Sequence, residues 1–238
     1  VNLFGRASLD PKKNSPGSVF YQNLVPTYGN PPTDGYFVNF NFGTFTYYHQ
    51  ISIGRLPVYT ANEAQNVVDK IITYDLQPPE KWWKNYIAIT GGGNRSEQLN
   101  FQAKSENFIN SYFKPAPASM NIARIYRNDS SGYVTYNYKD SIKKEFDRGS
   151  MIVNFIGHAA AQDWEIGLED PTTLANGNKQ PLVLSFTCFT GQNSETNRRS
   201  FGEEFILEPG KLAIGFVGTT GWSFSGVGDS YNDRLIKN

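Results

Sequence analysis

PLVLSFTCFTG, residues 181–191, is a run of β-forming apolar residues that passes directly into a turn. A short apolar run bounded by turn residues is typical of a strand buried on both faces of a parallel sheet. The stretch also holds Cys188, the single cysteine of the chain. It therefore poses two questions: which sheet contains this strand, and whether Cys188 is a buried thiol or a nucleophile displayed at the strand tip.

Four further apolar runs of similar length occur in the chain, and helical patterns separate most of them. Short apolar strands that alternate with helices predict an α/β domain in which helices cover both faces of a mostly parallel sheet. The expected strands are residues 85–90, 120–126, 150–157, 181–188 and 212–218. The expected helices are residues 94–112, 138–149 and 200–207.

The first third of the chain reads as a smaller unit, in which a loop-rich segment separates expected strands at 1–5 and 49–58. Thr60 and Glu63 then form a T-x-x-E capping box, which predicts the start of a helix. The linker LQPPEKWWK that follows places a boundary near residue 80. We therefore predict a partial subdomain at 1–80 and a second subdomain at 81–238. The apolar face expected for the helix consists of Ala64, Val67, Val68, Ile71 and Ile72.

Composition excludes several classes of protein. The 22 Lys and Arg residues balance the 22 Asp and Glu residues, so the chain lacks the basic surplus typical of nucleic-acid binding. No apolar run approaches the ~20 residues that a transmembrane helix needs, and a single cysteine excludes an internal disulfide. The chain opens on VNLF, without a Met or a secretory leader pattern, and we interpret it as a mature form or a fragment.

A second reactive side chain, His158 in FIGHAAAQDW, follows the expected strand 150–157 much as Cys188 ends the strand 181–188. Parallel α/β sheets bind their ligands beyond the carboxyl ends of the strands. The 30 residues that separate positions 158 and 188 suit one crossover between neighbouring strands, which would set the two tips side by side. A thiol and an imidazole suffice for acyl transfer, and N–H groups of the turns could bind the oxyanion.

The ordinary interpretations of these residues stay open at this point. Lone cysteines are most often inert core residues, and a lone histidine at a strand end is more often structural than catalytic. His49 is interpreted as structural. GGGN, residues 91–94, could bind an anion at a helix N-terminus, but a tight turn explains it better. One Cys and two His cannot alone form a metal site, whereas a calcium site of carboxylates and carbonyls would leave no mark in the sequence.

At these residues the sequence resembles the gingipain-type cysteine peptidases, a family with a caspase-like fold. FIGHAAAQDW is similar to the family segment G-H-G-x-x-x-x-W: Gly157 and His158 match, and Trp164 keeps the spacing. PLVLSFTCFTG resembles the segment that bears the nucleophile of the family. Residues 51–75 resemble the strand and helix before the catalytic subdomain. Residues 198–222 resemble the region after the nucleophile, and are most similar to the type IX secretion system sortase branch.

The resemblance implies a caspase–hemoglobinase three-layer α/β fold with a mostly parallel sheet, preceded by part of a smaller α/β subdomain. It implies that Cys188 is the nucleophile and that His158 protonates the leaving amine. The backbone N–H groups of Ala159 and Cys188 would form the oxyanion hole, and Trp222 would border the substrate pocket. Some members add an acidic residue beside the histidine, and Glu97 lies in the corresponding block. This chemistry requires no cofactor, and a structural calcium ion stays open.

One departure from the family pattern is Ala159, which stands where the family has glycine; alanine does not easily adopt a positive φ. The leading interpretation is a cysteine peptidase, either a hydrolase or a sortase-like transpeptidase. It would act on polypeptides, be secreted or located at the bacterial cell surface or outer membrane, and work with type IX secretion components. A degenerate caspase-like interaction module is the alternative, and it predicts a distorted turn at 158–162 or a pocket with no room for a peptide. A third interpretation is a small-molecule-binding α/β domain that binds its ligand at GGGN.

The residue that would select the substrate stays open as well. Relatives that cleave after Arg or Lys need an acid at the base of the specificity pocket. The candidates include Asp163, Glu165 and Glu169.

Overall fold

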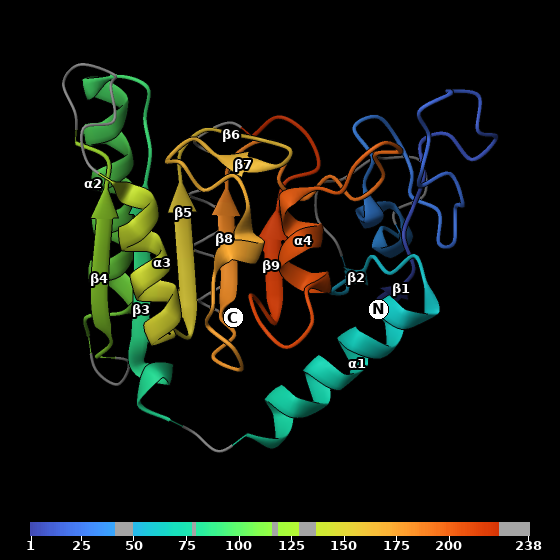
Figure 1. Ribbon diagram of the computed structural model, residues 1–238. Coiled ribbons are helices and arrows are strands. Elements are labelled where there is room, and N and C mark those ends of the chain that lie inside the picture. Colours follow the sequence, from blue (N-terminus) through green and yellow to red (C-terminus); the bar gives the residue numbers. More distant parts are fainter. Residues whose placement is uncertain (41–49, 78–79, 116–118, 129–136, 224–238) are drawn as a thin grey trace.

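The computed structural model contains a sheet of five parallel strands in the order β4–β3–β5–β8–β9 (Figure 1). β3 (Asn85–Thr90) pairs on one side with β4 (Asn121–Tyr126) and on the other with β5 (Ile152–Ile156). β8 (Leu182–Phe186) lies between β5 and β9 (Gly215–Gly218). The mostly parallel sheet predicted from the sequence is therefore confirmed. The structure describes residues 1–40, 50–77, 80–115, 119–128 and 137–223.

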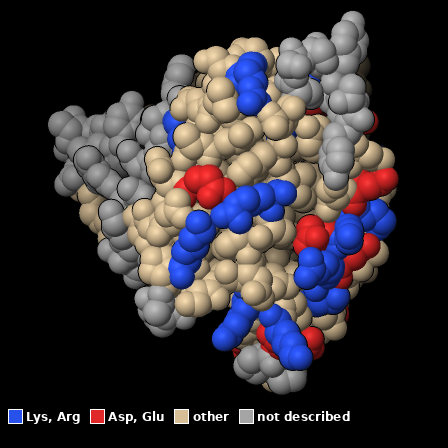
Figure 2. All heavy atoms as spheres, turned by 90° about the vertical axis from the view of Figure 1, so that its left-hand side faces the viewer, with Lys and Arg blue, Asp and Glu red and all other residues tan. Residues whose placement is uncertain are grey.

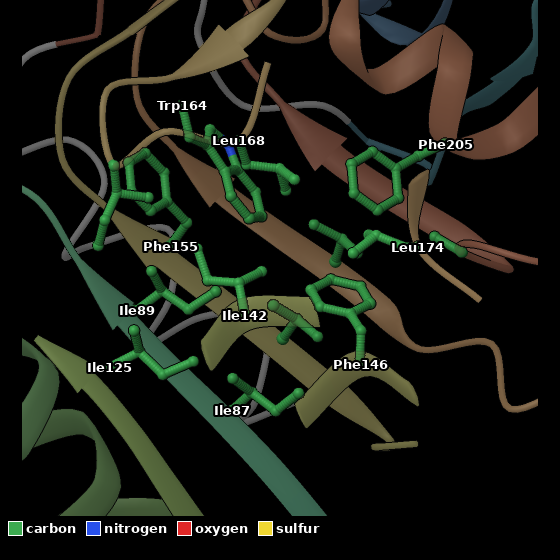
Figure 3. Close-up of a cluster of buried hydrophobic side chains, with 14 of the residues drawn as sticks. Ile87, Ile89, Ile125, Ile142, Phe146, Phe155, Trp164, Leu168, Leu174 and Phe205 are labelled. Carbon is green, nitrogen blue, oxygen red and sulfur yellow. The ribbon is translucent and has the colours of Figure 1, made fainter. Parts of the chain in front are cut away.

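Helices cover both faces of the sheet, as expected for a three-layer α/β fold. Successive residues of a strand point to opposite faces, and alternate residues of β3 accordingly join two different core clusters. Ile87 and Ile89 belong to the cluster that includes side chains of α3 (Tyr138–Arg148) and α4 (Phe201–Leu207) (Figure 3). Tyr86 and Ala88, which alternate with them along β3, belong to the cluster that includes side chains of α2 (Arg95–Tyr112).

Local capping explains where these helices begin and end. The side chains of Asn94, Asn137 and Ser200 each accept a backbone N–H from the first turn of α2, α3 and α4, respectively. Such caps satisfy N–H groups that have no partner within the helix. Gly149 ends α3 with a φ of 86°, a conformation that glycine adopts without strain.

The first 80 residues form a second, two-stranded parallel sheet of β1 (Asn2–Phe4) and β2 (Gly54–Leu56), followed by α1 (Ala61–Leu76). β2 is shorter than the predicted strand at 49–58, and His49 lies outside the described residues. The division of the chain near residue 80 stays a prediction. The remaining elements are η1 (Asp34–Val38), η2 (Lys81–Lys84), β6 (Ala159–Ala160), β7 (Asp163–Trp164) and η3 (Pro171–Thr173).

The predicted capping box of α1 is present, but the predicted buried face is partly wrong. Val67 is buried against α4, whereas Val68, Ile71 and Ile72 are exposed. The helix lies at the lower edge of the molecule in Figure 1 and presents a narrow stripe to α4 instead of a broad apolar face. That stripe includes Lys70, because its ammonium group reaches the carbonyls at the end of α4.

Lys70 is expected to contribute strongly to the attachment of α1. Its Nζ donates to the carbonyl oxygens of Phe205, Ile206 and Glu208 at 3.0, 3.1 and 3.2 Å. Replacement by methionine would leave these helix-end carbonyls without their donor, so we expect Lys70→Met to lower the free energy of unfolding by about 2 kcal/mol. Urea titration of both proteins measures the difference.

The same substitution should change the pH dependence of stability. Burial lowers the pKa of Lys70 to about 7, so between about pH 7 and 10 the unfolded chain binds more protons than the folded one. Stability then rises with pH in wild type, and the stability difference between wild type and Lys70→Met should grow over this window. Lys144→Met, at an exposed position of α3, serves as the control. A difference that shrinks with rising pH would contradict this account.

Charges of both signs lie side by side on the face formed by α2, α3 and β4 (Figure 2). Ion pairs on these elements join Arg124 with Glu106 and Arg148 with Glu145. The described part of this face therefore presents mixed charge and no uniform basic patch. Among the helices of the described residues, none combines the length and apolar character that a bilayer-spanning segment needs.

Candidate active site

The tips of β5 and β8 lie next to each other at the carboxyl edge of the sheet. The two strands pair in parallel, with Ile156 opposite Phe186 at their ends. His158 and Cys188 each follow two residues beyond these paired positions. The crossover of 30 residues between them connects neighbouring strands, as predicted. The fold therefore brings the thiol-bearing and imidazole-bearing residues to equivalent positions of one sheet edge, where parallel α/β folds bind ligands.

Cys188 is half-buried, which separates it from a fully buried core cysteine. Its Sγ accepts the backbone N–H of Ser223 at 3.4 Å. The next residue, Phe189, has a φ of 59°, and its N–H donates to the carbonyl of Gly221 at 2.9 Å. A left-handed non-glycine residue makes a sharp turn at some cost in strain. Trp222 is 77% exposed and packs edge-on against the Phe189 ring, with centroids 4.9 Å apart.

The His158 side chain is 54% exposed and is held from one side by α2. Its Nε2 lies 3.2 Å from Oε2 of Glu97, and its ring meets the Phe101 ring edge-on at 5.7 Å. The N–H of Gly93 and the hydrogen bond with His158 lower the pKa of Glu97. Glu97 is therefore a carboxylate at neutral pH, able to orient the imidazole and balance the charge of its protonated form.

The contact between Glu97 and His158 depends on strand order. α2 begins directly after β3, and β3 pairs with β5 as well as with β4. The first turn of α2 therefore lies beside the tip of β5, which carries His158. The family resemblance indicated Glu97 as an acid that could lie beside the histidine. The pairing of β3 with β5 could not be predicted from the sequence, because β4 lies between these strands along the chain.

Residues 159–164 form a regular β-hairpin of β6 and β7, so the distorted turn expected for a degenerate site is wrong. The N–H of Glu165 donates to the carbonyl of His158 at 3.1 Å, which makes these two residues a hydrogen-bonded pair. In an antiparallel ladder the next residue, Ala159, then directs its N–H away from the partner strand. Ala159 lies in a strand and has no positive φ, so its side chain causes no strain.

Trp164 fixes this hairpin to the strand that leads to Cys188. Its side chain is fully buried and stacks on Phe155, with centroids 4.5 Å apart (Figure 3). Its Nε1–H donates to Oγ of Ser185 at 2.9 Å, and that hydroxyl bonds to Oγ1 of Thr190 at 3.0 Å. Because Ser185 and Thr190 flank Cys188 in sequence, one buried indole connects the two strand tips.

The GGGN turn does not present free amides to an anion. The N–H groups of residues 91–93 donate to the carbonyl of Ile156 at 2.9 Å, to Oε1 of Glu165 at 2.7 Å and to Oε2 of Glu97 at 2.8 Å. A tight turn capped by the carboxylates of the protein accounts for the motif. Within the described residues, no group of three or more His, Cys, Asp or Glu could hold a metal ion.

Comparison with solved structures identifies the fold. The chain aligns with the crystal structure of the Arg-specific cysteine proteinase gingipain R (RgpB), with a TM-score of 0.74 and 16% identity over 100% of this chain and 52% of that chain. A complex of Porphyromonas gingivalis RgpB pro- and mature domains matches with a TM-score of 0.74 and 15% identity over 100% and 53% of the two chains. A third structure, described as a protease, matches with a TM-score of 0.69 and 18% identity over 94% of this chain and 46% of that chain.

These similarities show a gingipain-like, caspase-like α/β fold, and the chain spans about half the length of the matched structures. No curated protein matches the chain. The family model described as Peptidase family C25 matches residues 1–238, which is the entire sequence. On that match, the chain belongs to peptidase family C25, the gingipain-type family of caspase-like fold.

Proposed function

We propose that this chain carries the catalytic centre of a cysteine peptidase, with Cys188 as nucleophile and His158 as general acid and base. The observation that carries the proposal is the register of β5 and β8, which sets Ile156 opposite Phe186 and so aligns the two reactive residues. The half-buried thiol, the exposed imidazole and membership of peptidase family C25 support the same assignment.

The first half of the reaction forms a thioester. The Cys188 thiolate attacks the carbonyl carbon of the peptide, a C–S bond forms, and the carbonyl electron pair moves onto oxygen. The N–H groups of Ala159 and Cys188 bind this oxyanion. Collapse re-forms the carbonyl and breaks the C–N bond, while the imidazolium of His158 gives its proton to the leaving amine. The products are a free amine and an acyl group on Cys188.

The second half releases the acyl group and restores the thiolate of Cys188 and the imidazolium of His158. A water molecule attacks the thioester and gives a proton to His158, the C–S bond breaks, and a carboxylic acid leaves. An amine that reaches the thioester before water would instead form a new amide, which is the sortase-like outcome. Both routes use only thiol and imidazole chemistry, so we propose no cofactor for the reaction.

The setting of this activity is also a proposal. We propose a polypeptide substrate and a secreted or bacterial surface location, by analogy with the gingipains. The proposal that the protein acts as a sortase-like enzyme with type IX secretion components rests on the sequence resemblance at residues 51–75 and 198–222. Trp222, exposed beside Phe189, would border the substrate.

A diverse peptide library tests the proposal. The full chain and its Cys188→Ala variant are incubated with the library, and mass spectrometry identifies the cleaved bonds. Wild type should cleave a subset of peptides that the variant leaves intact. Added glycinamide should appear in the products if an amine can intercept the thioester. The same cleavage by both proteins would reject the assignment of Cys188, and cleavage by neither would reject the peptidase proposal and favour the interaction module.

Glu97 is proposed as a positioning residue for His158. In Glu97→Gln the amide cannot balance the imidazolium charge, and a hydrogen bond to a charged group contributes about 1.5–3 kcal/mol. We therefore expect kcat for the best library peptide to fall about tenfold or more, while KM changes little. Glu106→Gln, on the same helix but paired with Arg124, is the matched control. Equal losses in the two variants would exclude a specific role for Glu97.

A further inference from the structure

The geometry points to Glu165 as a positioning residue of the proposed active site. We infer that its carboxylate holds the backbone of His158 and the turn before α2 in one arrangement. This inference rests on the proposed function and extends it, because it names a group that neither touches the substrate nor contacts the imidazole.

Glu165 binds both polar groups of the His158 backbone. Its Oε1 accepts the N–H of His158 at 2.7 Å, and its own N–H donates to the His158 carbonyl at 3.1 Å. The same Oε1 accepts the N–H of Gly92 at 2.7 Å. Hydrogen bonds from amides to a carboxylate are short and strong. A single oxygen atom therefore joins the tips of β3 and β5, two strands that are neighbours in the sheet.

Two glycines leave the space that this carboxylate occupies. A Cβ atom on Gly91 would overlap Oε1 of Glu165. A Cβ atom on Gly157 would lie 3.0 Å from the same oxygen and 2.6 Å from Cζ of Phe155. The contact at residue 91 is closer than a real Cβ atom tolerates, so this residue must be glycine for the bridge to form. At residue 157 the contact with Oε1 is tight, and the closest contact is with the Phe155 ring.

The charge of Glu165 is balanced at the same edge of the sheet. Its side chain is 18% exposed, and its Oε2 lies 3.8 Å from Nη1 of Arg127, which is almost buried. The N–H of Arg127 donates to the carbonyl of Thr90 at 2.9 Å, which fixes this residue beyond the tip of β4. The ion pair with Arg127 and the two amide donors offset the cost of desolvating the Glu165 carboxylate. A carboxylate engaged in this way is a poor candidate for the acid of a specificity pocket.

The bridge has two consequences for the proposed chemistry. The His158 carbonyl and the Ala159 N–H belong to one planar peptide group, so the bond from Glu165 to that carbonyl fixes the direction of the proposed oxyanion donor. The bond to Gly92 fixes the turn that leads to Glu97, and Glu97 contacts the imidazole. Loss of Glu165 should therefore disturb both the direction of the Ala159 N–H and the contact between Glu97 and the imidazole.

Kinetics separate positioning from simple stabilisation. Displacing a reacting group by about 1 Å can cost about 10² in rate, so we expect Glu165→Ala to lower kcat about 10- to 100-fold, with KM within about twofold. Glu165→Gln keeps an oxygen that accepts both N–H groups and should recover most of the loss. Glu145→Gln, which removes a surface carboxylate of α3 that pairs with Arg148, should match wild type. Wild-type kcat in Glu165→Ala would overturn the inference.

Hydrogen exchange tests the bridge without any substrate. In wild type, exchange of the Gly92 and His158 amides requires their hydrogen bonds to Glu165 to break. Glu165→Ala removes these bonds, so both amides should exchange at least about tenfold faster. Neither amide should change in Glu145→Gln. Faster exchange without cleavage of any library peptide would uphold the bridge and reject the proposed function. Unchanged exchange in a folded Glu165→Ala protein would reject the bridge and leave the proposed function standing.

Discussion

Replacement of His158 by alanine is expected to lower kcat/KM for the best library peptide by about 10²–10⁴, the range that a general acid and base contributes. The side chain is 54% exposed, so its removal costs little packing and the variant should remain folded. Without the imidazole, the leaving amine has no proton donor at the strand tip, and water has no base. The loss should appear in kcat, with a small change in KM.

The control for this variant is Lys144→Ala, at an exposed position on α3, which should retain wild-type kinetics. Peptide cleavage and circular dichroism are measured on the same samples. A folded His158→Ala protein that cleaves the peptide within a factor of three of wild type would remove His158 from the mechanism.

Glu203→Gln is expected to give the largest loss of stability. Glu203 and Arg6 are both buried; Arg6 Nε lies 2.5 Å from Glu203 Oε1, and Nη2 lies 3.1 Å from Oε2. The Arg6 guanidinium also stacks over Phe20 at 4.3 Å. The pair joins the segment after β1 to α4. Removing one partner of a buried pair leaves an unpaired charge and costs about 3–5 kcal/mol, which chemical denaturation would measure.

Glu145→Gln provides the matched comparison, because its partner Arg148 is largely exposed, and surface pairs contribute at most about 1 kcal/mol. Adding Arg6→Met to Glu203→Gln should recover part of the lost stability, since no buried charge then lacks a partner. A loss below 1 kcal/mol in Glu203→Gln would show that this pair does not hold the first segment to α4.

The strands of the main sheet could be predicted from the sequence because most of their residues are apolar, and the central strands β3, β5 and β8 are largely buried. The helices could be predicted because polar N-caps such as Asn94 and Ser200 mark their starts. The spacing of residues 158 and 188 also indicated the correct pairing of β5 with β8. Each of these predictions rests on a short stretch of sequence or on the number of residues between two positions.

The features that sequence reasoning missed depend on contacts between distant segments. The pairing of β3 with β5 brings Glu97 to His158, and nothing in residues 85–97 indicates that neighbour. The hairpin 159–164 has strands of two residues, too short for any periodic pattern. Lys70 faces α4 although its helix offers apolar residues elsewhere, because the carbonyls at the end of α4 need a donor.

Glu165 illustrates the same limit from the chemical side. From the sequence alone, Glu165 is one of several candidate acids for the base of a specificity pocket. Its role becomes visible when the amides of Gly92 and His158 are seen to meet at one oxygen. Gly91 belongs to a motif that the sequence explains as a tight turn, yet the space that it leaves is filled by this carboxylate.

The most direct test of the central claim, that Cys188 is a nucleophile served by His158, is to map a covalent adduct. The probe is a peptidyl acyloxymethyl ketone that carries the residues preceding the bond cleaved in the best library peptide. Mass spectrometry of the digested protein should find one ketone adduct on Cys188 of the native chain, formed at least about tenfold more slowly in His158→Ala. An unmodified Cys188 in folded protein, or equal labelling rates with and without His158, would contradict the account.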